Sequence, residues 1–303
     1  MRRVSLAPPL LAALLLTTAC SPANGDENAA AEDQKSEKPG KKKKKKHSLE
    51  NDLIDAAVPG LRRVGSLAGV PESSGLAPAE KPGTYFSFGD NGNMPTLYRL
   101  DATGKVLADI TLAARNDDWE SLTRDPQGTY FIGDCGNNES DRQNLRLLRV
   151  NPAQPAQVGK IKFTYPDQTE FPPKKKQRNF DCEAIVWHEG KVWLFTKDQQ
   201  QRASTVYTVP DQPGEYRATR VTSLALPGQV TDAALSPNGR RLILLGRGEL
   251  FILDGNSWAD ILKATPKEID LAGTGQTEGV AFKDEQTLLI STEEGGLFEF
   301  TLP

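Results

Sequence analysis

Short runs of apolar and alternating residues recur along this chain as five copies of one unit. Each copy opens on an acidic residue, continues through an apolar run, turns, and returns through a second apolar run that ends on a polar residue. Runs of this length, bounded by turn-forming sequences such as Pro237-Asn238-Gly239, are typical of antiparallel β-strands. The opening residues are Glu72, Glu120, Glu183, Asp232 and Glu278, and the returning runs cover 85–90, 130–134, 192–198, 242–247 and 288–293.

The spacing of the copies predicts an all-β fold, a β-propeller with five four-stranded blades. The opening acidic residues are 48, 63, 49 and 46 positions apart, which is the length of one blade. Six blades remain an alternative, because the 63-residue interval has room for another hairpin. The last copy ends after its third strand, and a lone apolar run at 61–67 precedes the first copy. We therefore expect this N-terminal strand to join the last blade and close the ring, which removes an open sheet edge.

The first fifty residues differ in character from the rest of the chain. Residues 1–19 contain a charged start, the apolar run 10–16 and small residues, which together indicate an export signal. The end of this segment, Ala19-Cys20, resembles the lipobox of bacterial lipoproteins, and the resemblance implies that Cys20 is lipidated. Ser21 then favours sorting to an outer membrane, with the protein facing the periplasm. An ordinary secreted protein is the alternative.

Residues 20–50 are predicted to form a disordered tether, and residues 51–303 to form the propeller domain. The tether contains a run of six lysines, 41–46, which either contacts anionic lipid head groups or acts as an extended, solvated spacer. Residues 1–50 hold ten basic and six acidic side chains, so the net charge of −3 for the whole chain leaves −7 on the remainder. An acidic domain of this kind is a poor nucleic-acid binder.

The acidic opening residues are candidate metal ligands. Because each one begins the predicted innermost strand of its blade, we expect all five to surround one mouth of the central channel. Hard carboxylate oxygens in such a ring suit Ca²⁺, and further oxygens are available nearby. The alternative is structural, with each acid joining its blade to the next through backbone hydrogen bonds. The predicted metal ligands are Glu72, Glu120, Glu183, Asp232, Glu278, Asp90 and Asp134, with Asp118, Asp181 and Asp198 as further oxygens and Lys197 and Arg247 as compensating cations.

The remaining candidate chemistry is limited. Cys135 and Cys182 fall on one face of neighbouring blades, so a disulfide is expected, with two unpaired thiols as the alternative. The chain has two histidines, His47 in the tether and His188 in a turn remote from the acidic mouth, which argues against histidine-dependent nucleophilic catalysis. No catalytic residue and no organic cofactor is therefore predicted. The basic loop 172–178 either holds a small anionic ligand or is a solvated surface loop.

Several short motifs together resemble the SdiA-regulated family of bacterial exported propellers. They include Glu72-Ser73-Ser74-Gly75, the stretch 132–138 (Ile-Gly-Asp-Cys-Gly-Asn-Asn), 180–185 and 276–282, and the resemblance covers most of residues 70–303. It implies an envelope-associated β-propeller without an agreed biochemical activity. The chain is more loosely similar to phytase-like esterase and gluconolactonase propellers, in which a central Ca²⁺ supports hydrolysis.

Two functional hypotheses follow from these observations. The first is a membrane-anchored envelope lipoprotein whose propeller binds a partner, either an envelope protein or a small anionic ligand. The second is a Ca²⁺-dependent hydrolase of the lactonase or phosphoesterase type, which uses the acidic mouth. Whether the protein is an enzyme is left open, with the binding module preferred.

Overall fold

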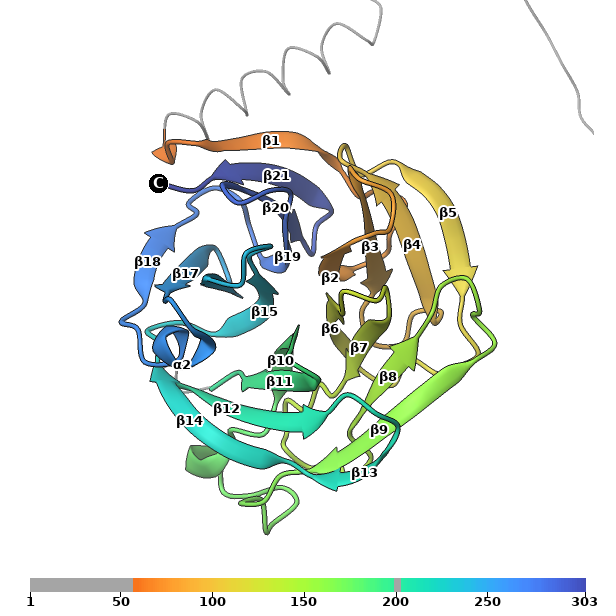
Figure 1. Cartoon of the computed structure of the whole chain (residues 1–303), viewed down its shortest axis with the longest axis vertical. Coiled ribbons are helices and arrows are strands. Elements are labelled where there is room, and N and C mark those ends of the chain that lie inside the picture. The colour runs from red at the N-terminus through yellow and green to blue at the C-terminus, as the bar shows by residue number, and fades with distance from the viewer. Residues whose placement is uncertain (1–56, 199–202) are drawn as a thin grey trace, which may run out of the picture.

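The computed structural model describes residues 57–198 and 203–303, and it shows five mainly antiparallel sheets arranged around a central axis (Figure 1). The predicted five-bladed β-propeller is therefore confirmed. The predicted signal segment 1–19, the lipidation site Cys20 and the tether 20–50 lie outside the described residues. Within the described part of the chain, no helix has both the length and the apolar character needed to cross a bilayer.

Each blade runs outward from an innermost strand next to the axis. The first blade consists of β2 (Ser73–Pro78), β3 (Thr84–Gly89), β4 (Thr96–Asp101) and β5 (Val106–Thr111), and the second of β6 (Trp119–Arg124), β7 (Tyr130–Asp134), β8 (Arg146–Val150) and β9 (Val158–Thr164). The third consists of β10 (Cys182–His188), β11 (Lys191–Thr196), β12 (Ala203–Pro210) and β14 (Thr219–Ala225), and the fourth of β15 (Val230–Leu235), β16 (Arg241–Gly246), β17 (Glu249–Asp254) and β18 (Lys267–Asp270). The fifth contains β19 (Thr277–Phe282), β20 (Thr287–Thr292), β21 (Gly296–Thr301) and, as its outer strand, β1 (Leu61–Ser66).

The N-terminal strand closes the ring as expected. β1 pairs antiparallel with β21, from Leu61 opposite Phe300 to Ser66 opposite Gly296. Figure 1 shows β1 lying along the outside of this last blade. Both ends of the closure lie within 57–303, so this part of the chain contains the complete ring.

The long 63-residue interval does not contain a sixth blade. The chain between β9 and β10 is a loop that holds only a short 3₁₀ turn, η1 (Lys175–Gln177). An extra strand, β13 (Gly214–Arg217), comes from the connection between β12 and β14 and pairs in parallel with β9. This strand covers the outer edge of the second blade, which would otherwise be an unpaired edge. A one-turn helix, α2 (Trp258–Ile261), follows β17.

The core is divided into five hydrophobic clusters, and each cluster fills the gap between two neighbouring blades. Between the first and second blades, Phe86 meets Tyr130 and Phe88 meets Trp119, edge to face, with ring centroids 5.2 and 5.3 Å apart. Edge-to-face aromatic pairs add about 0.5–1.5 kcal/mol beyond the burial of their area. A blade is therefore stabilised mainly by its neighbours, as in other repeat folds.

A β-bulge near the start of the innermost strand recurs in four blades. The register shifts between Trp119 and Ser121 in β6, between Cys182 and Ala184 in β10, and at the corresponding places in β15 and β19. A bulge leaves one residue unpaired and re-aims its side chain. The bulged residues are Glu120, Glu183, Thr231 and Glu278.

Candidate functional site

The three bulged glutamates, Glu120, Glu183 and Glu278, line a cavity of about 80 Å³ at one mouth of the channel. The predicted cations Lys197 and Arg247 also line it, which confirms that they accompany the acidic residues. The other residues around this acidic mouth are Glu72, Ser73, Ser74, Asp90, Asn138 and Glu293.

Two carboxylates of the acidic mouth and a third beside it, that of Asp118, come together closely enough to share one cation. One oxygen from each of Asp90, Asp118 and Glu120 lies within 4.8 Å of the others. Asp90 follows the last residue of β3, and Asp118 immediately precedes β6. The second strand of the first blade and the innermost strand of the second therefore supply the group, so it bridges two blades.

Gly136 is required where these carboxylates meet. A Cβ at this position would lie 2.2 Å from Glu120 Oε1 and 2.6 Å from Asp118 Oδ2. Real Cβ atoms do not approach other atoms this closely. The absence of a side chain at Gly136 thus creates the space that the acidic oxygens occupy.

The three acidic residues are held in an environment that disfavours negative charge. Burial raises the pKa of Glu120 well above its ordinary value, and the Glu183 and Asp90 carboxylates raise it further. Burial also raises the pKa of Asp118 to about 6, against the opposing effect of Arg142, and it raises the pKa of Asp90. Glu120 is 7% exposed, and no hydrogen bond or ion pair from the described residues reaches its carboxylate. A buried acid of this kind favours either a proton or a cation.

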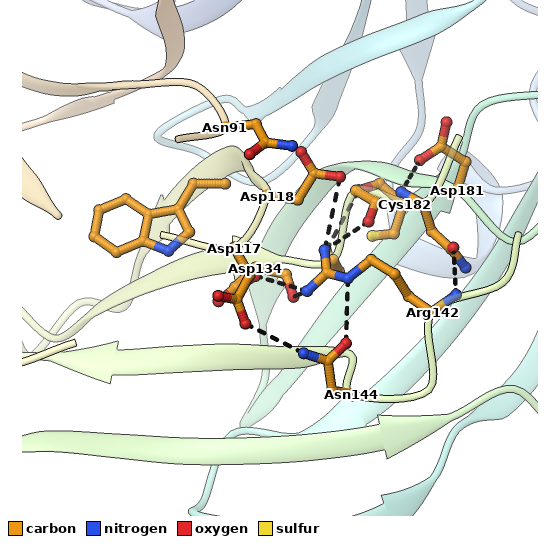
Figure 2. Close-up of polar contacts among 12 residues, drawn as sticks. Asn91, Asp117, Asp118, Asp134, Arg142, Asn144, Asp181 and Cys182 are labelled. Atoms are coloured by element: carbon orange, nitrogen blue, oxygen red, sulfur yellow. Dashed lines mark hydrogen bonds and ion pairs between the residues drawn. The ribbon is translucent and has the colours of Figure 1, made fainter. Parts of the chain in front are cut away.

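Arg142, from the loop between β7 and β8, contacts one member of the group, Asp118, and Figure 2 shows its guanidinium between Asp118 and Asp134. Its guanidinium lies 3.7 Å from Asp118 Oδ2, donates to the backbone oxygen of Gly136 at 2.6 Å, and pairs with Asp134 Oδ1 at 2.9 Å. Arg146 pairs with the other Asp134 oxygen at 2.6 Å. Asp134 is therefore fully buried between two arginines and lies apart from the three clustered carboxylates, although the sequence predicted it as a ligand.

The other bulged glutamates have cationic partners. Glu183 Oε1 accepts from Lys197 Nζ at 2.7 Å, and both side chains are buried. Burial alone would lower the pKa of Lys197, but the Glu183 and Asp181 carboxylates outweigh it and raise that pKa. Glu278 lies 3.8 Å from Arg247, and burial together with the nearby Glu183 raises its pKa to about 7.

Glu72 reaches the mouth by a different route. It precedes β2 in the left-handed backbone region, at φ 44°, and its carboxylate accepts from Asn93 Nδ2 at 2.9 Å. In the first blade the position equivalent to Glu120 is Ser74, whose hydroxyl donates to the backbone oxygen of Glu120 at 2.9 Å. The predicted ring of five equivalent acids is thus three bulged glutamates plus one glutamate from a loop.

The placement of Asp232 in this ring was wrong. The bulged residue of β15 is Thr231, and Asp232 is one position later, so its side chain reaches across the channel instead of lining the acidic mouth. Asp232 is fully buried, and its two oxygens accept from Ser121 Oγ at 2.5 Å and from the Val280 N–H at 2.8 Å. Ser121 Oγ in turn accepts from the Ile185 N–H at 3.0 Å. Asp232 therefore joins several innermost strands, which is the structural role that the sequence left open for the acids.

The two cysteines lie on neighbouring blades as expected, but the expected disulfide is not present. Both are free thiols and both are buried. Cys135 Sγ donates to the backbone oxygen of Cys182 at 3.4 Å, while the Cys182 N–H donates to the Cys135 oxygen at 3.4 Å. The contact between the blades is therefore made by hydrogen bonds instead of a sulfur–sulfur bond.

Sequence reasoning missed Gly136, Arg142 and Arg146, because their roles depend on how the loop after β7 returns to the mouth. The motif 132–138 was the available signal, since a glycine flanked by polar residues directly after an apolar strand marks a special backbone position.

In the basic loop 172–178, Arg178 pairs with Glu139.

The sequence matches no known protein-family profile and no curated protein. Solved structures resemble it at low identity. A candidate gluconolactonase is 10% identical, with a TM-score of 0.47 over 80% of this chain and 91% of the other. The PQQ-bound aldose sugar dehydrogenase of Streptomyces coelicolor is 10% identical, with a TM-score of 0.46 over 80% and 97% of the two chains. Virginiamycin B lyase of Staphylococcus aureus is 14% identical, with a TM-score of 0.40. The match covers 76% of this chain and 66% of the lyase. These similarities concern the propeller fold alone.

Proposed function

We propose that this protein is a binding module of the bacterial cell envelope whose propeller holds a divalent cation, of the Ca²⁺ type, at the acidic mouth. The observation that carries the proposal is the group Asp90, Asp118 and Glu120, in which the carboxylate of the buried Glu120 makes no hydrogen bond or ion pair with the described residues. The lipobox resemblance at Cys20 and the similarity to SdiA-regulated propellers support an exported, lipid-anchored protein at the outer membrane.

The distances fit a cation with oxygen ligands. Ca²⁺ binds oxygens at about 2.3–2.6 Å, so two ligands of one ion lie at most about 5 Å apart. The three clustered oxygens fall within 4.8 Å of one another, which satisfies this limit. A donor set made only of carboxylates favours Ca²⁺ or Mg²⁺ over the transition metals, which prefer nitrogen or sulfur ligands.

The size of the cavity supports an ion over a larger molecule. Pockets for small organic ligands usually measure about 300–1,000 Å³. The acidic mouth encloses about 80 Å³, which suits an ion with a few waters. This difference favours the binding module over the hydrolase.

A metal-dependent hydrolase remains the second candidate because of Lys197 and Arg247. These two cations lie beside the carboxylates at the same mouth and provide positive charge for an anionic substrate resting on the rim. A bound cation would supply Lewis-acid chemistry at this place. Hydrolysis of a lactone or phosphoester panel by the Ca²⁺-loaded protein, lost in Glu120→Gln, would select this candidate.

Thermal unfolding tests the proposed cation site. Residues 51–303 are freed of metal with a chelator and then melted with increasing Ca²⁺, Mg²⁺ or Mn²⁺. A ligand bound only by the folded state adds about 2.7 kcal/mol of stability at 100 times its Kd, so a saturable rise in Tm with Ca²⁺ is expected.

Two variants make this test specific. Glu120→Gln removes one charge of the group and should abolish the Ca²⁺-dependent shift, while the exposed control Asp109→Asn should retain it. The proposal fails if no cation shifts the Tm, or if Glu120→Gln and the control respond alike.

A further inference from the structure

A second and larger cavity lies at the opposite mouth of the channel. It measures about 600 Å³ and is formed where the innermost strands β2, β6, β10, β15 and β19 end, whereas the acidic mouth is formed where they begin. Its volume falls within the range of about 300–1,000 Å³ that is usual for small-molecule sites. No part of the proposed cation site contributes to it.

Small side chains form part of the lining of this cavity. The innermost strands contribute Ala77, Ala234 and Ala281; Ala234 is partly exposed, whereas Ala77 and Ala281 are buried against the clusters between the blades. The floor is made of buried apolar residues, Leu122 and Val280 among them. The Asp232–Ser121 hydrogen bonds cross the channel next to this floor, so the two mouths are separate sites.

The rim of the cavity is preorganised. Prolines lie at three places around it: Pro78 ends β2, and Pro126 and Pro237 lie in turns. Proline fixes the backbone φ angle, so these turns lose little conformational freedom when a ligand binds. A rigid cavity binds a ligand more tightly than a flexible one with the same contacts, because less conformational entropy is lost on binding.

The charged groups of the rim favour a negatively charged partner. Arg124 lines the cavity, and no carboxylate of the described residues lies within ion-pair distance of it. Its Nη1 donates to the backbone oxygen of Ala79 at 3.4 Å and its guanidinium lies 5.7 Å from the centre of the Tyr130 ring, so the side chain is held in place while its charge has no anionic partner within the described residues. Asp125 is also on the rim, but its Oδ1 accepts from the Thr129 N–H at 2.7 Å, within its own turn. Burial lowers the pKa of His188, against the opposing effect of Glu189, so this side chain is uncharged at neutral pH.

From these features we propose that this mouth binds a small amphipathic anion, with an apolar body on the alanine-lined floor and one carboxylate or similar group at Arg124. The apolar body supplies most of the affinity through burial, and the guanidinium selects for the charged end. A ring system of two fused six-membered rings fits the volume. This site is independent of the cation at the acidic mouth.

Isothermal titration calorimetry with 2-naphthoate tests the proposal on residues 51–303, with 2-naphthalenemethanol as the uncharged probe of equal size. Saturable one-site binding of 2-naphthoate is expected, about tenfold tighter than that of the alcohol. Arg124→Gln should remove this preference, while Arg115→Gln, an exposed arginine beside β6, should leave it unchanged. Ala234→Phe fills the cavity and should weaken both probes at least tenfold.

Three results would overturn the proposal. The first is an absence of saturable 2-naphthoate binding to the unsubstituted propeller. The second is equal binding by Arg124→Gln and the unsubstituted protein. The third is undiminished affinity in an Ala234→Phe variant whose melting temperature matches that of the unsubstituted propeller. Since Ala234 is only partly buried, this variant is expected to fold, and Ala234→Met provides a milder filling of the same space.

Discussion

Replacing Asp232 should destabilise the propeller more than replacing any exposed acid. Asp232 lies between the innermost strands, where its carboxylate accepts from Ser121 of the second blade and from Val280 of the fifth. The backbone N–H groups of Ala233 and Leu76 also lower its pKa, although burial dominates and raises that pKa to about 8. One side chain thus serves donors on several blades at the point where they converge.

The expected magnitude follows from the donors that Asp232→Ala would leave without an acceptor. The Val280 N–H and the Ser121 hydroxyl are both buried, and each unsatisfied buried donor costs about 1–3 kcal/mol. The two together predict a loss of about 2–6 kcal/mol. Domains of this kind have a free energy of unfolding of about 5–15 kcal/mol, so the loss is a large share of the total.

Urea denaturation of residues 51–303, followed by circular dichroism, measures this loss as a lower midpoint. Asp232→Asn keeps one acceptor oxygen and the size of a neutral acid, so it should cost about 1 kcal/mol. The exposed Asp109→Ala is the matched control and should stay within about 0.5 kcal/mol of the unsubstituted protein. A loss below about 1 kcal/mol for Asp232→Ala would refute the assigned role of this residue.

Three further outcomes are expected. Burial raises the pKa of Asp118 to about 6 and that of Glu278 to about 7, so the metal-free propeller should lose stability as pH rises from about 4 to 7. Urea denaturation in the presence of a chelator measures this loss, and midpoints that stay constant over this pH range would contradict it. Gly136→Ala should weaken Ca²⁺ binding at least tenfold in calorimetry, since its Cβ would clash with the clustered carboxylates; unchanged affinity would show that the ion binds elsewhere. Lys197→Met should lower the free energy of unfolding by about 3–5 kcal/mol, because it leaves Glu183 buried without its cation. Adding Glu183→Gln should recover part of that loss in urea denaturation, whereas strictly additive losses would argue against the pair.

The repeat makes the architecture predictable from the sequence alone. Apolar runs at blade spacing and the lone strand at 61–67 were enough to place β1 beside β21, because a closed ring leaves no unpaired strand edge. The grouping of Glu120 and Asp90 at one mouth was also accessible, since equivalent positions of a repeat lie at one end of the fold. The alanine-lined cavity was not accessible, because its volume depends on how far the strands diverge at their ends.

The sequence by itself determined the fold class, the count of five blades, the closing strand and the acidic character of one mouth. These features follow from strand periodicity and repeat length, which are local properties of the chain. Only the tertiary structure decided which acids face the cavity. A β-bulge changes the side-chain direction by one position, so Glu120, Glu183 and Glu278 point into the mouth. Asp232, one residue later than the bulged Thr231, instead joins innermost strands across the channel. Pairing between strands sets the position of each bulge, and that pairing exists only after the blades have formed.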